Sequence, residues 1–216
     1  MYYFLDIEEQ IKRILNKISF KDLSRDKISS SAEILEDICD GTYYKSLLES
    51  EDGELLKKKE ALTFLINTDG ASICKKSGLT IWPVYLTINE IRDKFAIKNV
   101  ILAGKFNKAL SLFLTNSRLK LNLLFIGLSV GDSKPNFDSF LHPIVVQLKK
   151  LEYGIDVPFD DITKEIKFFL THAVMDKPAK SALLNMISST GFYGCTKCLQ
   201  PGKSLRKNLN RKINMD

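Results

Sequence analysis

Residues 165–186, EIKFFLTHAVMDKPAKSALLNM, place an apolar run directly before an acid, a proline and a helix-forming segment. The apolar run predicts a buried strand. Asp176 stands where it can cap the following helix, and Pro178 falls in the first helical turn, where proline is tolerated. Residues 61–70, ALTFLINTDG, repeat the pattern, with Asp69 directly after a strand. Two strands that each run into a carboxylate indicate an α/β fold with a polar site at the strand ends.

The intervening segments complete the predicted core. Residues 73–88, ICKKSGLTIWPVYLTI, predict a turn and a second strand, and residues 99–104, NVILAG, predict a third. Apolar residues at helical spacing over 138–154 predict a helix that ends at Gly154. The resulting order is strand, strand, strand, helix, strand, helix, with an acid after the first and the fourth strand. This order predicts a partial ribonuclease-H-like core, which is a mixed sheet covered by helices.

Three parts are predicted along the chain. Residues 1–55 form a small helical region, because apolar residues recur at three- and four-residue steps along its first third. The connector SEDGELLKKKE, residues 50–60, marks the boundary to the core, which is assigned to residues 60–194. Residues 195–216 hold the CxxC pair and a basic tail.

Composition is that of an ordinary soluble protein. The chain has 216 residues, of which 44% are hydrophobic and 27% charged, enough for one large domain or two small ones. No apolar run approaches the roughly 20 residues of a membrane-spanning helix, so a membrane partner is not expected. Four cysteines are too few for a secreted disulfide scaffold of this length and indicate a reducing, intracellular compartment. No pattern in the sequence indicates an oligomeric state.

Positive charge points to an anionic partner, of which DNA is one. The formal net charge is +6, and a basic surface attracts phosphate groups. Asp216 is the one acid among the residues from Cys195 onward. The basic residues of that stretch are Lys197, Lys203, Arg206, Lys207, Arg211 and Lys212. A solvated, disordered tail and a phosphate-binding arm are both compatible with this pattern.

Carboxylates at neighbouring strand ends suit divalent-metal chemistry. Two Mg²⁺ or Mn²⁺ ions about 3.5–4 Å apart activate an attacking oxygen and stabilise the leaving one, and such hard cations take oxygen ligands. We therefore expect the carboxylates of Asp69 and Asp176 to lie roughly 4–8 Å apart. Each acid also has a plain structural interpretation. The pair Asp69-Gly70 is a common hairpin-turn signal, and Asp176 is a good helix N-cap.

Several segments together resemble the catalytic region of a transposase family. They are NTDG, SGLTIWPVYLTINEI, GDSKPNF, FLHPIV, DKPAKSALLNM and GFYGCTKCLQPG, and they span roughly residues 33–202. The chain resembles animal transposases related to the CACTA (En/Spm-like) group of cut-and-paste elements. The resemblance implies a ribonuclease-H-like DDE fold, divalent-metal cleavage and joining of DNA, and a nuclear location.

The resemblance also implies roles for four residues. Asp69 would be the first catalytic acid and Asp176 the second, both binding Mg²⁺ or Mn²⁺, while Cys195 and Cys198 would be two zinc ligands. The third acid and the remaining zinc ligands of the family lie beyond the point where this chain ends. Two thiolates fill half of the tetrahedral Zn²⁺ shell.

Closure of the zinc shell by further ligands and redox chemistry at the CxxC are the two alternatives for the cysteine pair. Closure needs His142, His172 or, as a further thiolate, Cys74. His172, in a strand-like run, is expected to be a packed neutral imidazole, and His142 is expected at the surface. A redox role lacks a preceding thioredoxin-like βαβ pattern.

A second departure from the family lies within the core. Removing residues 105–127 joins Gly104 to Leu128 and gives NVILAG-LSVGDSKPNF, which follows the family pattern. We interpret 105–127 as an insertion, by hypothesis a translated intron. The tail from Lys203 is by the same hypothesis a second one, because a Gly-Lys pair spans the start of both segments. A genuine helical insertion in a loop is the alternative.

The leading functional interpretation is therefore a truncated, transposase-derived protein with little or no activity. The alternatives are a catalytically dead DNA-binding or interaction protein and a pseudogene product.

Overall fold

The computed structural model describes residues 1–23, 38–51, 53–73, 78–91, 123–187, 191–198 and 201. The chain divides into two compact units, Met1–Val174 and Met175–Asp216, and each is described by itself. Among the described residues, no helix is long and apolar enough to span a membrane.

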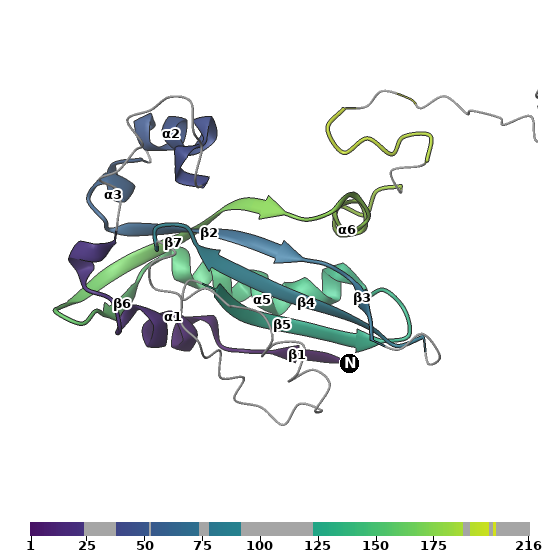
Figure 1. Ribbon diagram of the computed structural model, residues 1–216, viewed down its shortest axis with the longest axis horizontal. Coiled ribbons are helices and arrows are strands. Elements are labelled where there is room, and N and C mark those ends of the chain that lie inside the picture. The colour runs from purple at the N-terminus through teal and green to yellow at the C-terminus, as the bar shows by residue number, and fades with distance from the viewer. Residues whose placement is uncertain are drawn as a thin grey trace, which may run out of the picture. The chain divides into compact units, whose positions relative to one another are not determined.

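A mixed sheet forms the centre of the first unit (Figure 1). Its path is β1-β5-β4-β2-β7-β6, and the short strand β3 also pairs with β4. The strands are β1 (Tyr2–Phe4), β2 (Ala61–Thr68), β3 (Ala71–Ser72), β4 (Thr80–Ile88), β5 (Leu123–Gly131), β6 (Ile155–Pro158) and β7 (Thr163–Val174). The predicted strands over 61–67, 79–88 and 165–175 are thus confirmed as β2, β4 and β7. The predicted α/β class with a mixed sheet is also confirmed.

Neighbouring strands of the sheet are antiparallel except for one parallel pair. The pairs β1–β5, β5–β4 and β4–β2 are antiparallel, and β6 and β7 form an antiparallel hairpin. By contrast, β2 and β7 are parallel, with Asn67 opposite Val174. A parallel pair requires a crossover connection, and the chain between β5 and β7 contains the long helix α5 (Phe137–Glu152).

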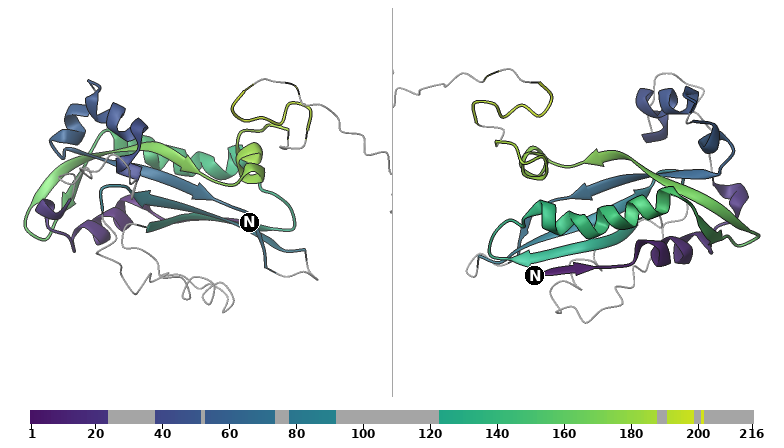
Figure 2. Two further views of the ribbon diagram at one scale, coloured as in Figure 1. Left: turned by 45° about the horizontal axis from the view of Figure 1, so that its top comes forward. Right: turned by 180° about the vertical axis from the view of Figure 1, so that it is seen from behind.

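Helix α5 covers one face of the sheet, as the right-hand view of Figure 2 shows. Asn136 caps the helix by accepting a hydrogen bond from the Ser139 N–H at 3.0 Å. The buried side of α5 consists of Phe140, Ile144, Leu148 and Leu151. Each such burial stabilises the fold by about 1.5–3 kcal/mol. The helix predicted over 138–154 is confirmed as α5, and Pro143 lies inside it.

The N-terminal residues differ in part from the predicted helical region. Tyr2–Phe4 form the edge strand β1, because these aromatic residues pair with β5 and extend the sheet. The predicted amphipathic helix follows as α1 (Ile7–Leu15), in which Ile7, Ile11 and Leu15 are fully buried. Two further helices, α2 (Thr42–Glu49) and α3 (Gly53–Lys57), precede β2.

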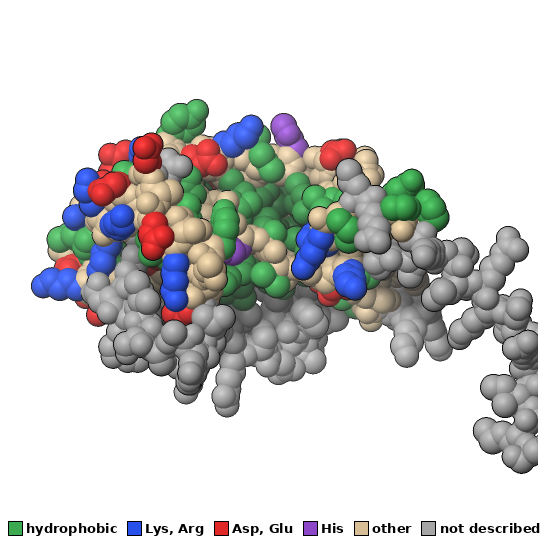
Figure 3. All heavy atoms as spheres, turned by 90° about the horizontal axis from the view of Figure 1, so that it is seen from above, with side chains coloured by type: hydrophobic (Ala, Val, Ile, Leu, Met, Phe, Trp, Pro, Cys, Tyr) green, Lys and Arg blue, Asp and Glu red, His purple; other side chains and the backbone are tan. Residues whose placement is uncertain are grey.

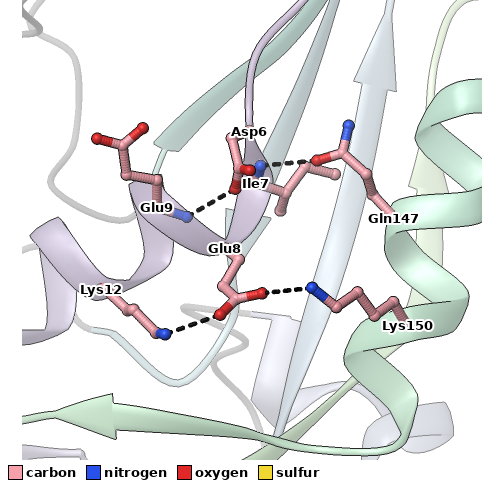
Figure 4. A network of polar contacts seen from close by, with 7 residues as sticks. All are labelled: Asp6, Ile7, Glu8, Glu9, Lys12, Gln147 and Lys150. Carbon is pink, nitrogen blue, oxygen red and sulfur yellow. Dashed lines mark hydrogen bonds and ion pairs between the residues drawn. The ribbon is translucent and has the colours of Figure 1, made fainter.

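Polar contacts join α1 to α5 (Figure 4). The Gln147 side-chain oxygen accepts a hydrogen bond from the Ile7 N–H at 2.9 Å. Glu8 lies 2.7 Å from Lys12 on its own helix and 3.0 Å from Lys150 on α5. The ammonium groups of Lys12 and then Lys150 lower the pKa of the Glu8 carboxyl. These contacts orient α1 alongside α5 while the apolar residues of both helices face the core.

The third predicted strand stays a prediction, and a strand that was not predicted lies further along the chain. Strand β5 occupies Leu123–Gly131, whereas the predicted strand 99–104 lies outside the described residues. The last five residues of the predicted insertion 105–127 therefore form the first half of a central strand, and residues 105–122 lie outside the described residues.

The second unit contains the short helix α6 (Lys177–Leu183) and the segment around the cysteine pair. The predicted helix after Asp176 is confirmed as α6.

Candidate functional site

Asp69 stands in a break between two strands that pair with the same neighbour. Thr68, the last residue of β2, lies opposite Val84, and Ala71, the first residue of β3, lies opposite Ile81. Between these pairs, Pro83 has no N–H to donate to a ladder. The Asp69-Gly70 pair is therefore no hairpin turn, because the strands on its two sides both pair with β4.

The geometry at this break leaves the Asp69 carboxylate at the surface. Asp69 is exposed, and its Oδ1 accepts a hydrogen bond from the Gly70 N–H at 2.7 Å. Gly70 is required by a close approach, since a Cβ there would lie 2.5 Å from Cζ2 of Trp82. Trp82 thus packs under the chain directly after Asp69 and fixes where this acid leaves the sheet.

Asp176 is the N-cap of α6 in the second unit. Its Oδ1 accepts a hydrogen bond from the Ala179 N–H at 2.7 Å, and Pro178 lies in the first turn. The capping interpretation is confirmed. Capping does not exclude a further role, because the residue is exposed and a carboxylate has a second oxygen.

Both acids follow neighbouring strands that end at the same edge of the sheet. Asn67 and Val174 are partners near the ends of β2 and β7, and the Asn67 side chain donates a hydrogen bond to the Val174 carbonyl at 2.6 Å. Asp69 comes two residues after Asn67, and Asp176 two residues after Val174. Since Asp176 belongs to the second unit, the separation of the two carboxylates stays a prediction.

Within the part of the chain that the structure describes, no three His, Cys, Asp or Glu side chains gather where one metal ion could bind them. The carboxylates of Asp69 and Asp176 could offer oxygen ligands to Mg²⁺ or Mn²⁺, but among the described residues no third acid gathers with either of them.

Cys195 and Cys198 lie together in an exposed turn. Their sulfur atoms are 3.2 Å apart, and both are free thiols. The Lys197 N–H, then the Cys198 thiol and the Cys198 N–H, donate to Cys195 and lower its pKa. A lowered pKa favours the thiolate, which is the form that binds metal or reacts. The pair therefore fits two positions of a zinc shell, and Cys74 lies outside the described residues.

The two histidines have the environments predicted for them. His142 is exposed on α5. His172 on β7 is partly buried, its ring meeting the Tyr43 ring edge-on at 5.2 Å between centroids. Burial lowers the pKa of His172, and the nearby Glu90 opposes this shift.

A buried carboxylate was missed by the sequence analysis. Glu90 is 1% exposed and follows β4. One of its oxygens accepts hydrogen bonds from the Tyr44 hydroxyl at 2.8 Å and the Thr63 hydroxyl at 2.7 Å, and the other accepts from the Thr63 N–H at 2.8 Å. The only sequence signal is an acid two residues after the end of a strand, with Asn89 before it and Ile91 after it.

Comparisons with protein-family models and with curated proteins gave no match.

Proposed function

We propose that the chain derives from a DDE-type cut-and-paste transposase related to the CACTA group, and that Asp69 and Asp176 are two acids of its divalent-metal site. The observation that carries the proposal is their position, since Asp69 directly follows β2 and Asp176 comes two residues after the end of β7, and these strands are adjacent and parallel. Carboxylates at such neighbouring ends are close enough in principle to share Mg²⁺ or Mn²⁺ ions.

Sheet topology supports the ancestry. In chain order, β2, β4 and β5 form an antiparallel meander, α5 follows, and β7 then returns beside β2 and parallel to it. This spatial order, third, second, first, fourth, is the one expected of a ribonuclease-H-like core. β1 extends the sheet beyond its third strand.

The chemistry of such a site is phosphodiester hydrolysis and transesterification on DNA. The residues of this chain would supply oxygen ligands, and the metal ions would activate the attacking oxygen and stabilise the leaving one. A complete site of this class has a third acid, and no residue here matches that motif. We therefore expect weak metal binding and DNA cleavage orders of magnitude slower than that of an intact enzyme. The same ancestry gives Cys195 and Cys198 as zinc ligands, DNA as the partner and the nucleus as the location.

Plasmid nicking tests the catalytic part of the proposal. Supercoiled DNA with Mn²⁺ should be nicked slowly, and Asp69→Asn and Asp176→Asn should each abolish the nicking. Asp132→Asn is the matched control, because Asp132 is also an exposed acid directly after a strand, β5. Nicking that survives Asp69→Asn contradicts the assigned site. Efficient DNA strand transfer by the protein contradicts the proposal that its activity is very low.

A second candidate function is DNA binding without catalysis, which the basic residues from Lys197 onward favour. Figure 3 shows acidic and basic side chains interspersed on one face, so the described residues form no continuous basic patch in that view. This candidate function assigns DNA binding to the basic residues of the tail. Glutamine at Lys203, Arg206, Lys207, Arg211 and Lys212 should flatten the salt dependence of DNA affinity by about 4.5 in log–log slope, at roughly 0.9 per phosphate contact. Fluorescence anisotropy over a salt series measures this, and an unchanged slope contradicts this candidate function.

A further inference from the structure

Two segments of the chain share one pattern. Residues 99–104, NVILAG, and residues 122–127, NLLFIG, each have an asparagine, four apolar residues and a glycine. The second segment is followed by LSVG, residues 128–131. In the structure it is residues 123–127 that, with 128–131, form β5.

The first half of β5 is an interior part of the sheet. Leu124, Phe125 and Ile126 are at most 5% exposed. On one side, residues 123–125 pair with β4, and on the other Gly127 lies opposite Phe4 of β1. Any replacement for this half strand must therefore be apolar and must keep the alternation of side chains between the two faces.

The end of this half strand is closely packed, so a large side chain at Gly127 would have to displace its neighbours. A Cβ at Gly127 would lie 2.9 Å from Cδ1 of Ile144, a buried residue of α5. The Phe4 and Phe140 rings are also near, at 3.7 and 3.8 Å. A larger side chain would therefore push the helix away from the sheet.

Residues 99–104 meet these requirements position by position. Gly104 matches Gly127, and Val100, Ile101, Leu102 and Ala103 match Leu123 to Ile126 in order. Both segments have six residues, so joining Gly104 to Leu128 leaves every later residue of the strand on its present face. Leu102 and Ala103 are smaller than Phe125 and Ile126, so the substituted core would be less filled.

We propose that the chain encodes the first half of β5 twice, and that residues 105–127 can be removed without loss of the sheet because residues 99–104 then take the place of 122–127. Residues 89–99 would still connect β4 to β5, and antiparallel neighbours need only a short connection. Two forms of the protein, with and without these 23 residues, would thus share one fold. This inference does not depend on the proposed function.

Deletion variants test the proposal. Without residues 105–127 the chain should unfold cooperatively, with a lower midpoint temperature than the full chain. Its Trp82 fluorescence should stay blue-shifted, because Trp82 is 6% exposed and packs against Phe137 beside the sheet. The matched control lacks residues 99–121, so it loses the same number of residues but keeps NLLFIG. A 105–127 deletion variant that lacks a cooperative transition overturns the proposal. If the control then unfolds cooperatively, residues 99–104 fail to replace 122–127; if it does not, the shortened connection between the strands is the reason.

Glycine substitutions identify the segment that forms the strand. In the full chain, Gly127→Leu should lower the midpoint temperature sharply, whereas Gly104→Leu should leave it unchanged. In the chain without residues 105–127, Gly104→Leu should become as damaging as Gly127→Leu is in the full chain. If Gly104→Leu is harmless in the deletion variant, residues 99–104 do not occupy the place of β5 and the proposal is wrong.

Discussion

At the scale of single residues, a buried carboxylate ties three elements together. Glu90 receives hydrogen bonds from Tyr44 of α2 and from both the hydroxyl and the N–H of Thr63 on β2. Asn89 adds a bond from its side chain to the Thr63 hydroxyl at 2.9 Å. A buried polar group is costly unless it is hydrogen-bonded. The network around Glu90 therefore holds α2 next to the first residues of β2.

Removing the Tyr44 hydroxyl should destabilise the protein without disturbing its packing. Tyr44→Phe takes one donor from the buried Glu90 and should lower the free energy of unfolding by about 1–3 kcal/mol. Urea unfolding measures the change. Tyr43→Phe is the matched control, because Tyr43 on the same helix is 59% exposed. Equal stability of the two variants would show that the Tyr44–Glu90 bond contributes nothing net.

His172 should make stability depend on pH. Burial lowers the pKa of its imidazole in the folded state, so the unfolded chain binds the proton more readily. The neutral His172 contributes fully to the stability of the fold above the pKa of the unfolded chain, about 6.5. That stability is lost as pH falls from there towards the pKa of the folded state. Unfolding free energies between about pH 7.5 and 5.5 should therefore fall less in His172→Gln than in the parent chain. A steeper fall in the variant would contradict this sign.

At the scale of elements, the Asp176 cap supports a helix of seven residues. Asp176→Ala removes the acceptor for the Ala179 N–H and should destabilise α6 by about 0.5–2 kcal/mol, whereas Asp176→Asn should keep the helix because Asn caps as well as Asp. Hydrogen exchange of the Lys180 and Leu184 amides reports the loss of the helix, because Lys180 donates to the Asp176 carbonyl and Leu184 to the Lys180 carbonyl. Unchanged protection in Asp176→Ala would show that the cap is dispensable.

Elements with one strong local pattern were predictable from the sequence. β2, β7 and α5 have long apolar patterns of clear period and lie where expected. β5 was missed because its first half falls in the segment 105–127, which was interpreted as an insertion. β1 was missed because Phe4, three residues before Ile7, continues the helical spacing of the following helix.

At the scale of the whole molecule, the candidate site depends on contacts that no local pattern contains. The pairing of β2 with β7 joins residues about a hundred positions apart, and it brings the positions before Asp69 and Asp176 together as neighbours. The sequence predicted that each acid follows a strand. It could not predict the network around Glu90, because Tyr44, Thr63 and Glu90 come from three separate segments.

Paramagnetic broadening by Mn²⁺ tests the shared metal site most directly. In the full chain, Mn²⁺ should broaden the amide signals of Gly70 and Lys177, which directly follow the two acids, with one common concentration dependence. Asp69→Asn should remove the broadening at both amides, because one site needs both carboxylates, whereas Asp132→Asn should leave it intact. Broadening of the Lys177 amide that is unchanged by Asp69→Asn would contradict a site shared by Asp69 and Asp176.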